Sequence, residues 1–340
     1  MKAVLFRKGR GLVCEDIPRP SPDPDQVLVQ VADTGFCGSD HTLVESGGLQ
    51  DGYILGHETS GTVVEIGNAV EGVTLGSRVI VRPTFCGTCG DCTAGRPYFC
   101  RQNRRSIGVG DLPGAFAETI TAYPQMLIPI PEGVDSKNAA LAEAFSASLH
   151  GINCSGNAGG SSLVIGGGPI GLALVRLLKV LEYGPIVLSE PVAEKRDLGR
   201  AFGADAAFDP LTEKIGLHVL EWTDGAGFDT VFECAGVADA LQTSMDAACK
   251  GGTVCVVSVG FNPVSIVPVT LNFKEIWVTG AYSNTHEENT RCLDWMAEGR
   301  LDARPLISDL IPLEDLPRVY REKIHTGKAI KVMVSIGDEF

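Results

Sequence analysis

The chain has 340 residues, of which 44% are hydrophobic and 21% are charged. This length suffices for two domains, because a single hydrophobic core seldom grows beyond about 250–300 residues. A net charge of −14 argues against nucleic acid and against an anionic membrane surface as partners. No apolar run approaches the roughly 20 residues of a membrane span, and the N-terminus lacks the apolar core of a secretion signal. We therefore expect a soluble, cytoplasmic protein, whose eleven cysteines bind metal or stay reduced.

The first third of the chain is rich in glycine and proline and contains short runs that are typical of strands. Prolines 18, 20, 22 and 24 form a stiff entry that cannot lie inside a helix. The runs at residues 27–31, 61–67 and 78–82 are apolar or alternating and are bounded by turn residues. This part of the chain is therefore predicted to be a β-rich domain with long functional loops.

Two potential metal ligands lie in this β-rich part. Cys37 stands in a glycine-flanked loop, and His57 follows Gly56 twenty residues later. A thiolate and an imidazole together suit zinc, and a catalytic zinc takes three protein ligands and leaves one position open. The third ligand could be Glu58, next to His57, or the remote Glu143. We predict a catalytic zinc site whose third ligand the sequence leaves undecided.

Four further cysteines are closely spaced and separated by glycines. Their spacing is C-x2-C-x2-C-x7-C, at Cys86, Cys89, Cys92 and Cys100. Four thiolates at such spacing can surround one tetrahedral zinc, with Zn–S bonds of about 2.3 Å. Because all four positions are filled by protein, this second zinc is predicted to be structural.

From about residue 151 the pattern changes to strands that alternate with helices. Such alternation predicts an α/β domain with a parallel, doubly wound sheet. A helix is predicted at residues 170–179 and another, after this domain, at residues 289–298. The predicted strands are residues 162–165, 186–188, 230–232, 253–257 and 277–279.

A glycine-rich turn joins the first of these strands to its helix. It fits the dinucleotide-binding pattern G-x-G-x-x-G, in which glycines permit a tight turn and a close approach of the pyrophosphate. Glu190 lies at the end of the next strand, nineteen residues after the last glycine. A carboxylate there can bind the ribose 2′-hydroxyl and repels a 2′-phosphate, so NAD is expected rather than NADP. The predicted cofactor-binding residues are Gly166, Gly168, Pro169, Ile170, Gly171 and Glu190.

Taken together, these motifs resemble the zinc-containing medium-chain dehydrogenase/reductase family of alcohol dehydrogenases. The resemblance rests on the G-H-E motif with its following glycines at residues 56–70, on the cysteine lobe, and on the tail at residues 327–332. It implies a GroES-like catalytic domain at residues 1–150 and 284–340, with the structural zinc lobe near residues 86–100. A Rossmann domain for NAD is then implied at residues 151–283.

Within this family, Glu143 resembles the glutamate of the polyol, butanediol and threonine dehydrogenase branch. Ala144 departs from the motif, because proline commonly follows that glutamate. Glu58 is implied either to bind zinc directly or to exchange with Glu143. Ser39 matches the hydroxyl that relays the substrate proton, and His41, one residue early for the relay histidine, is either a relay residue or a surface residue.

The expected function is the zinc- and NAD-dependent oxidation of a secondary alcohol, a polyol or diol, to a ketone. Two zinc ions per chain and a homo-oligomer, either a dimer or a tetramer, are implied by the resemblance. Oxidation of an amino alcohol such as threonine is one alternative. A non-catalytic nucleotide-binding member is another, and the cysteine lobe disfavours a metal-free quinone reductase.

Overall fold

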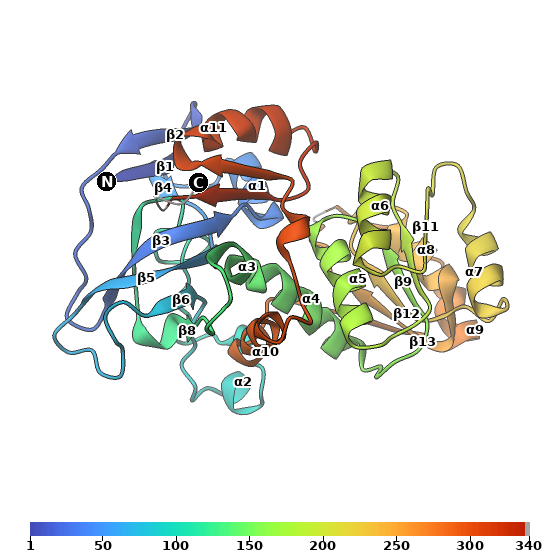
Figure 1. Cartoon of the computed structure of the whole chain (residues 1–340). Coiled ribbons are helices and arrows are strands. Elements are labelled where there is room, and N and C mark those ends of the chain that lie inside the picture. The colour runs from blue at the N-terminus through green and yellow to red at the C-terminus, as the bar shows by residue number, and fades with distance from the viewer. Residues whose placement is uncertain (261, 337–340) are drawn as a thin grey trace. The chain divides into compact units, whose positions relative to one another are not determined.

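The computed structural model describes residues 1–260 and 262–336 and separates into two compact units. The first unit comprises Met1–Glu143 and Thr285–Phe340, and the second comprises Ala144–Asn284. The first unit thus contains both the start and the end of the chain, blue and red in Figure 1. No helix of the described residues is long and apolar enough to cross a membrane.

Two sheets form the framework of the first unit. The larger sheet has seven strands in the order β15-β16-β3-β5-β6-β8, with β7 paired to β3, and the smaller has the order β2-β1-β4. The strands are β1 (Lys2–Arg7), β2 (Gly11–Asp16), β3 (Val27–Gly35), β4 (Tyr53–Ile54), β5 (Glu58–Ile66), β6 (Arg78–Val81), β7 (Thr119–Ala122), β8 (Leu127–Pro129), β15 (Asp309–Pro312) and β16 (Val332–Ser335).

Every second residue from Val27 to Val31 of β3 packs into the apolar core beside the large sheet. Val27, Val29 and Val31 are fully buried and belong to one apolar cluster with residues of β5 and β6. The last strand, β16, pairs antiparallel with β3, so that Val334 lies opposite Thr34. Residues from the two ends of the chain therefore complete one sheet.

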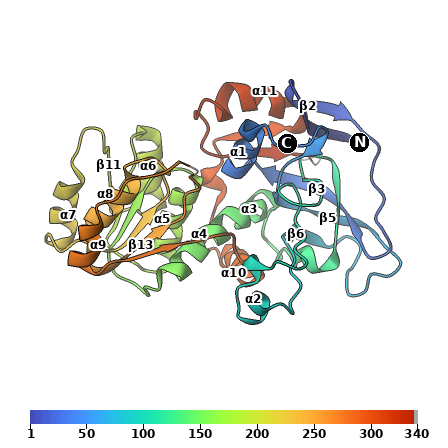
Figure 2. The ribbon, with the colours of Figure 1, turned by 180° about the vertical axis from the view of Figure 1, so that it is seen from behind.

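The helices of the first unit are short, apart from α10. They are α1 (Gly38–Ser46), α2 (Gly90–Thr93), α3 (Ser136–Ala140), α10 (His286–Ala297) and α11 (Leu316–Val319), which continues as a π-helical turn (Tyr320–Ile324). Helix α11 packs against β2, and both views show them side by side (Figures 1 and 2).

Helix α10 was predicted at residues 289–298, but it begins three residues earlier. The side-chain oxygen of Thr285 accepts from the backbone N–H of Glu288, and the Glu288 carboxylate accepts from the backbone N–H of Thr285. This reciprocal capping box satisfies N–H groups that would otherwise lack partners, and it starts the helix at His286.

The second unit is a six-stranded parallel sheet in the order β11-β10-β9-β12-β13-β14. Helices α5 and α6 cover one face, in front in Figure 1, and α8 and α9 cover the other, in front in Figure 2. This arrangement confirms the predicted doubly wound sheet. Its strands are β9 (Ser162–Ile165), β10 (Ile186–Ser189), β11 (Ala206–Phe208), β12 (Phe228–Glu233), β13 (Ala248–Val256) and β14 (Trp277–Gly280). Its helices are α5 (Pro169–Val180), α6 (Ala193–Phe202), α7 (Ile215–Thr223), α8 (Ala240–Ala247) and α9 (Pro268–Lys274), and α4 (Ala142–Ser155) leads into them.

Candidate active site and metal centres

The N-terminus of α1 fixes the position of Cys37. Cys37 is the residue before the first helical turn, and its backbone N–H donates to the Asp40 carboxylate over 3.0 Å. Asp40 is fully buried, and its second oxygen lies 3.4 Å from the backbone nitrogen of Gly56. One carboxylate thus joins the loop that carries Cys37 to the turn that carries His57.

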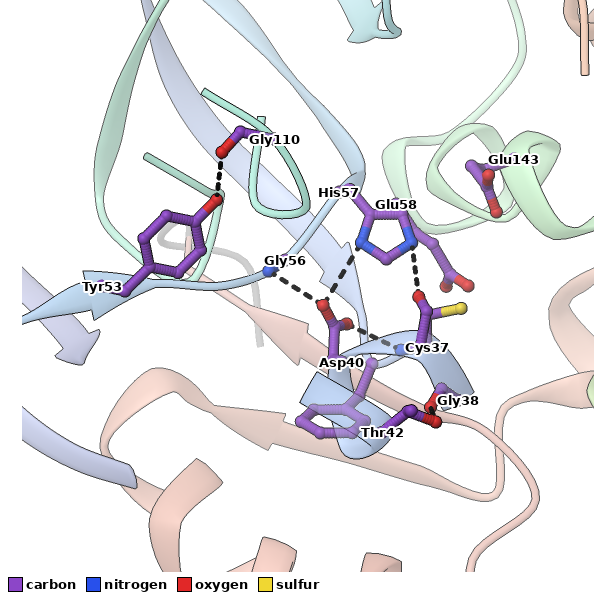
Figure 3. A network of polar contacts seen from close by, with 12 residues as sticks. Cys37, Gly38, Asp40, Thr42, Tyr53, Gly56, His57, Glu58, Gly110 and Glu143 are labelled. Atoms are coloured by element: carbon purple, nitrogen blue, oxygen red, sulfur yellow. Dashed lines mark hydrogen bonds and ion pairs between the residues drawn. The ribbon is translucent and has the colours of Figure 1, made fainter. Parts of the chain in front are cut away.

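The turn before His57 requires glycine. Gly56 has φ +97°, and a β-carbon there would lie 3.0 Å from the backbone nitrogen of Phe116. This conformation directs His57 inward, with Nδ1 3.3 Å from the Asp40 carboxylate (Figure 3). Nε2 lies 3.4 Å from the Ser39 hydroxyl. A carboxylate at Nδ1 is the usual outer partner of a metal-binding histidine, and it leaves Nε2 for the metal.

The charge state of His57 follows from the same contacts. Burial lowers the pKa of His57, but the negative charges of Asp40 and Cys37 outweigh burial and raise that pKa well above its usual value. A metal binds only the deprotonated nitrogen, so zinc uptake at this position is expected to release a proton.

Glu58 is held by a buried lysine. The ammonium group of Lys331 lies 2.7 and 2.8 Å from the two Glu58 carboxylate oxygens, and it also donates to the Phe36 carbonyl over 3.2 Å. Both side chains are 1% exposed. Burial lowers the pKa of Lys331, but the negative charges of Glu58, Cys37 and Glu143 raise it above its usual value. Glu58 therefore compensates a buried positive charge.

Glu143 lies at the start of α4 and is paired with an arginine. Arg82 donates to its carboxylate over 2.9 Å and to the His57 carbonyl over 3.1 Å. The Glu143 side chain is 12% exposed, against 1% for Glu58. Arg82 therefore places the Glu143 carboxylate in the same region as the backbone of His57.

Cys37 and His57 supply two ligands that suit zinc, and Glu58 and Glu143 are the two candidates for the third ligand. In Figure 3 the Cys37 sulfur and the carboxylates of Glu58 and Glu143 lie on the Nε2 side of the His57 ring. The Cys37 thiol also contributes to the raised pKa of His57. In the described part of the chain, no three of the four side chains Cys37, His57, Glu58 and Glu143 have ligand atoms that all lie within 4.8 Å of one another. Lys331 binds the Glu58 carboxylate and Arg82 binds the Glu143 carboxylate, and these ion pairs hold both carboxylates away from Cys37 and His57.

The two predicted proton-relay residues have different surroundings. Ser39 contacts the His57 imidazole, as described above. His41, two residues further along α1, instead lies with Nδ1 3.1 Å from the Tyr320 hydroxyl. Among the described residues, His41 and Ser39 form no hydrogen bond with each other. The structure thus associates Ser39, but not His41, with His57.

Sequence reasoning missed the two cations that surround the predicted ligands. Arg82 ends an apolar run at residues 78–82, and Lys331 precedes the last strand between apolar residues. A charged residue within an apolar run is a signal that a buried partner exists. That signal does not identify the partner.

The four-cysteine lobe has the geometry of a zinc site. Four sulfur atoms lie within 4.8 Å of one another, those of Cys86, Cys89, Cys92 and Cys100. The sulfurs of Cys86 and Cys92 are 3.8 Å apart and those of Cys89 and Cys92 are 3.4 Å apart, close to the ~3.8 Å that tetrahedral Zn–S bonds of about 2.3 Å require. Backbone N–H groups of Thr88 and Cys89 lower the pKa of Cys86 to about 6, which favours its metal-binding thiolate, whereas burial and the neighbouring thiols raise the pKa of Cys92 to about 12.

Cys92→Ser is expected to remove one zinc per chain and to open the lobe to proteases. With one thiolate replaced, the tetrahedral site is incomplete, and residues 86–100 have few buried side chains to hold them otherwise. Zinc content and protease cleavage sites mapped by mass spectrometry measure both effects. Cys249→Ser, a thiol of the second unit, is the control and should keep full zinc content. A Cys92→Ser protein with unchanged zinc content would rule out the structural site.

The glycine-rich turn of the second unit has room for a ligand. A β-carbon at Gly171 would lie 1.8 Å from the Gly166 carbonyl oxygen, so glycine is required there by helix-on-strand packing. A β-carbon at Gly168 meets no protein atom within 4 Å. Protein packing therefore does not explain Gly168, which precedes α5 and its Pro169. Glycine at such a position lets a pyrophosphate approach the helix N-terminus, so the turn fits a dinucleotide.

Glu190 lies at the carboxyl end of β10, beside this turn. Its two oxygens accept from the backbone N–H groups of Gly167, over 2.6 Å, and of Val192, over 2.9 Å. Ile170 stands in the first turn of α5. The predicted cofactor-binding residues are thus gathered at the carboxyl ends of β9 and β10, where doubly wound sheets bind ligands.

A β-rich unit with zinc-type ligands, joined to a dinucleotide-binding sheet, defines the class of zinc-binding dehydrogenases. Family models agree: residues 23–132 match the alcohol dehydrogenase GroES-like domain, and residues 169–298 match the zinc-binding dehydrogenase domain.

Individual proteins match over nearly the whole chain. The 2-dehydro-3-deoxy-L-galactonate 5-dehydrogenase of Pseudoalteromonas atlantica is 31% identical over 94% of both chains. The sorbitol dehydrogenase of Halalkalibacterium halodurans is 32% identical, covering 98% of this chain and 99% of the relative. A crystal structure of a zinc-binding dehydrogenase from Sinorhizobium meliloti, bound to NADP, is 33% identical with a TM-score of 0.89 over 98% of both chains.

The chain belongs to the zinc-containing medium-chain alcohol dehydrogenase family. It is an oxidoreductase that acts on alcohols with zinc and a nicotinamide coenzyme. The predicted fold class, GroES-like domain plus Rossmann domain, is confirmed.

Proposed function

We propose that this protein oxidises a secondary alcohol, a polyol or diol, to a ketone and transfers the hydride to NAD⁺. The observation that carries the proposal is that the Ser39 hydroxyl lies 3.4 Å from Nε2 of His57 and that the Cys37 sulfur lies on the same side of the ring (Figure 3). Sorbitol dehydrogenase among the relatives is, by its name, a polyol enzyme, which supports the substrate class. In this proposal the first unit is the catalytic domain and the second unit is the coenzyme domain.

Zinc, when bound at Cys37 and His57, supplies a Lewis acid that favours the alkoxide form of the substrate. The scale of that effect is seen in water, whose pKa a zinc ion lowers from 15.7 to about 7. Asp40 orients His57 and stabilises its Nδ1–H. Ser39, beside Nε2, accepts the alcohol proton and passes it outward.

Between the two candidate carboxylates, we assign Glu143 as the third ligand. Glu143 forms an ion pair with Arg82 and is the more exposed of the two carboxylates. Glu58 binds Lys331 with both of its oxygens, and moving it to a metal would leave the buried ammonium without compensation. Glu58 then acts by holding Lys331 in place beside the site.

An assay of NADH formation across alcohols tests the proposal. The panel contains sorbitol, 2,3-butanediol, sugar acids and threonine, at matched enzyme and NAD⁺ concentrations. The highest kcat/KM is expected for a polyol or diol. A highest value for threonine would instead establish amino-alcohol oxidation, and NADH binding without turnover of any alcohol would establish a non-catalytic protein.

Glu190→Ala is expected to shift coenzyme preference toward NADP⁺. A hydrogen bond from the ribose 2′-hydroxyl to a charged group is worth about 1.5–3 kcal/mol, so the ratio of kcat/KM for NAD⁺ to that for NADP⁺ should fall roughly 10–100-fold. The ratio is the decisive quantity, because a loosened glycine turn would affect both coenzymes alike. Glu194→Ala, on the exposed first turn of α6, is the control. An unchanged ratio in Glu190→Ala would remove Glu190 from coenzyme selection.

The edge strand β14 supports the proposal of a homo-oligomer. Trp277 is 74% exposed on this strand, and Phe273 is 79% exposed on the preceding helix. A bare apolar edge strand invites pairing with another strand, and two copies can pair edge to edge about a two-fold axis. Trp277→Asp should lower the mass measured by light scattering, whereas Leu211→Asp, at another exposed apolar residue, should not. An unchanged mass in Trp277→Asp would exclude this edge as the interface.

A further inference from the structure

A second group of metal-type side chains lies apart from both predicted zinc sites. His41 and Glu45 are one helical turn apart on α1, and His325 follows the π-helical turn near the C-terminus. One ligand atom from each of the three lies within 4.8 Å of the other two. Side chains at positions i and i+4 share one face of a helix, so the spacing on α1 is suited to a common ligand.

The three side chains are already joined through polar contacts. Nδ1 of His325 lies 3.3 Å from the Glu45 carboxylate, and the Tyr320 hydroxyl donates to the same oxygen over 2.7 Å. The Tyr320 oxygen also lies 3.1 Å from Nδ1 of His41. The rings of His41 and His325 face each other edge-on, with centroids 5.9 Å apart. Two imidazoles, one carboxylate and one phenol are therefore gathered in one place.

We propose that His41, Glu45 and His325 form a third, surface site for a divalent transition metal such as Zn²⁺. Two imidazoles and a carboxylate are ligands that zinc commonly takes, and a water molecule completes the tetrahedron. Bonds of about 2.0–2.2 Å place neighbouring donor atoms about 3.3–3.6 Å apart, which the His325–Glu45 distance of 3.3 Å already satisfies. Tyr320 remains as the outer partner that orients the carboxylate.

Exposure and charge both favour this site. Glu45 and His325 are about half exposed, at 48% and 54% of their side chains, so they can adjust to close the remaining distance. Among the described residues, no lysine or arginine forms an ion pair with Glu45 that would have to be displaced by a cation. With neutral imidazoles the group carries one negative charge, which attracts a dication.

The site would link two segments that are far apart in the sequence. Helix α1 contributes Cys37 and Ser39 at its beginning and the two proposed ligands further along. A metal bridging α1 to His325 would hold that helix against the C-terminal segment. Bound metal is therefore expected to stiffen the element that carries the candidate active-site residues.

Titration of the zinc-loaded enzyme with Zn²⁺ tests the inference. Free zinc is followed with a fluorescent indicator in competition, and the amount bound per chain is counted. Wild-type protein should take up one further ion beyond the resident ones. His325→Ala and Glu45→Gln should each weaken this uptake by at least ~10-fold, because each removes a ligand.

Arg321→Ala, an exposed change on the same segment, is the matched control and should bind like wild type. Thermal unfolding gives a second readout, because added Zn²⁺ should raise the Tm of wild type and of Arg321→Ala but not of His325→Ala. The inference is overturned if wild type takes up no further ion at micromolar Zn²⁺. It is equally overturned if His325→Ala binds the ion as tightly as wild type does.

Discussion

Replacing Cys37 by serine should remove one of the two expected zinc ions per chain and lower kcat/KM by at least ~10³-fold. A hydroxyl is a poor substitute for the thiolate that zinc prefers, and the Lewis acid is worth several kcal/mol, at about 1.36 kcal/mol for each factor of ten. Zinc content by atomic absorption and NADH formation with the best alcohol of the panel measure the two effects.

Cys14→Ser is the control for this experiment, since Cys14 is a partly buried thiol on β2 of the same unit. It should retain both zinc ions and nearly full activity. If Cys37→Ser loses no zinc, Cys37 is not a ligand; if it loses zinc and keeps its activity, the proposed mechanism is wrong.

Lys331→Met should destabilise the protein by about 3–5 kcal/mol. The change leaves the Glu58 carboxylate buried without its counter-ion, and an uncompensated buried charge carries a cost of this size. The loss of stability is measured as the change in unfolding free energy or, where unfolding is irreversible, as the fall in Tm. Lys328→Met, at an exposed lysine of the same segment, should change little.

A second substitution separates loss of the charge pair from loss of packing. The double variant Lys331→Met with Glu58→Gln contains no buried charge at this position, so it should recover a large part of the lost stability. Recovery of none of it would mean that the ion pair is not the source of the effect. The raised pKa of Lys331 adds a pH signature: stabilisation is complete below the usual value of 10.5 and is lost as pH rises through the raised value.

Local patterns were sufficient to predict the fold class of each unit and most strands of the parallel sheet. The strand-turn-helix at residues 162–179 was predicted because apolar runs, glycines and the helix start follow one another directly. Strand β11 was not predicted, since Ala206, Ala207 and Phe208 are too few and contain no β-branched residue. The early start of α10 depends on a side-chain cap at Thr285 rather than on apolar periodicity.

Among the candidate sites, too, local spacing predicted the cysteine lobe but not the ion pairs between residues far apart in the sequence. The cysteine lobe lies within fifteen residues of sequence, and its spacing alone predicted the cluster that the structure contains. The pairs Glu58–Lys331 and Arg82–Glu143 join residues 273 and 61 positions apart. Such pairings are decided by which strands and helices meet in the fold, so no local pattern could predict them.

The discontinuous first unit also has a consequence for how the protein is made. Strand β3 lies between partners that include β16, which follows the whole second unit in the sequence. The second unit, Ala144–Asn284, is one continuous stretch and is synthesised completely before β16 exists. Because domains fold as units during translation, the coenzyme-type unit is expected to fold first. The large sheet and the Glu58–Lys331 pair are then completed only after the second unit has been synthesised.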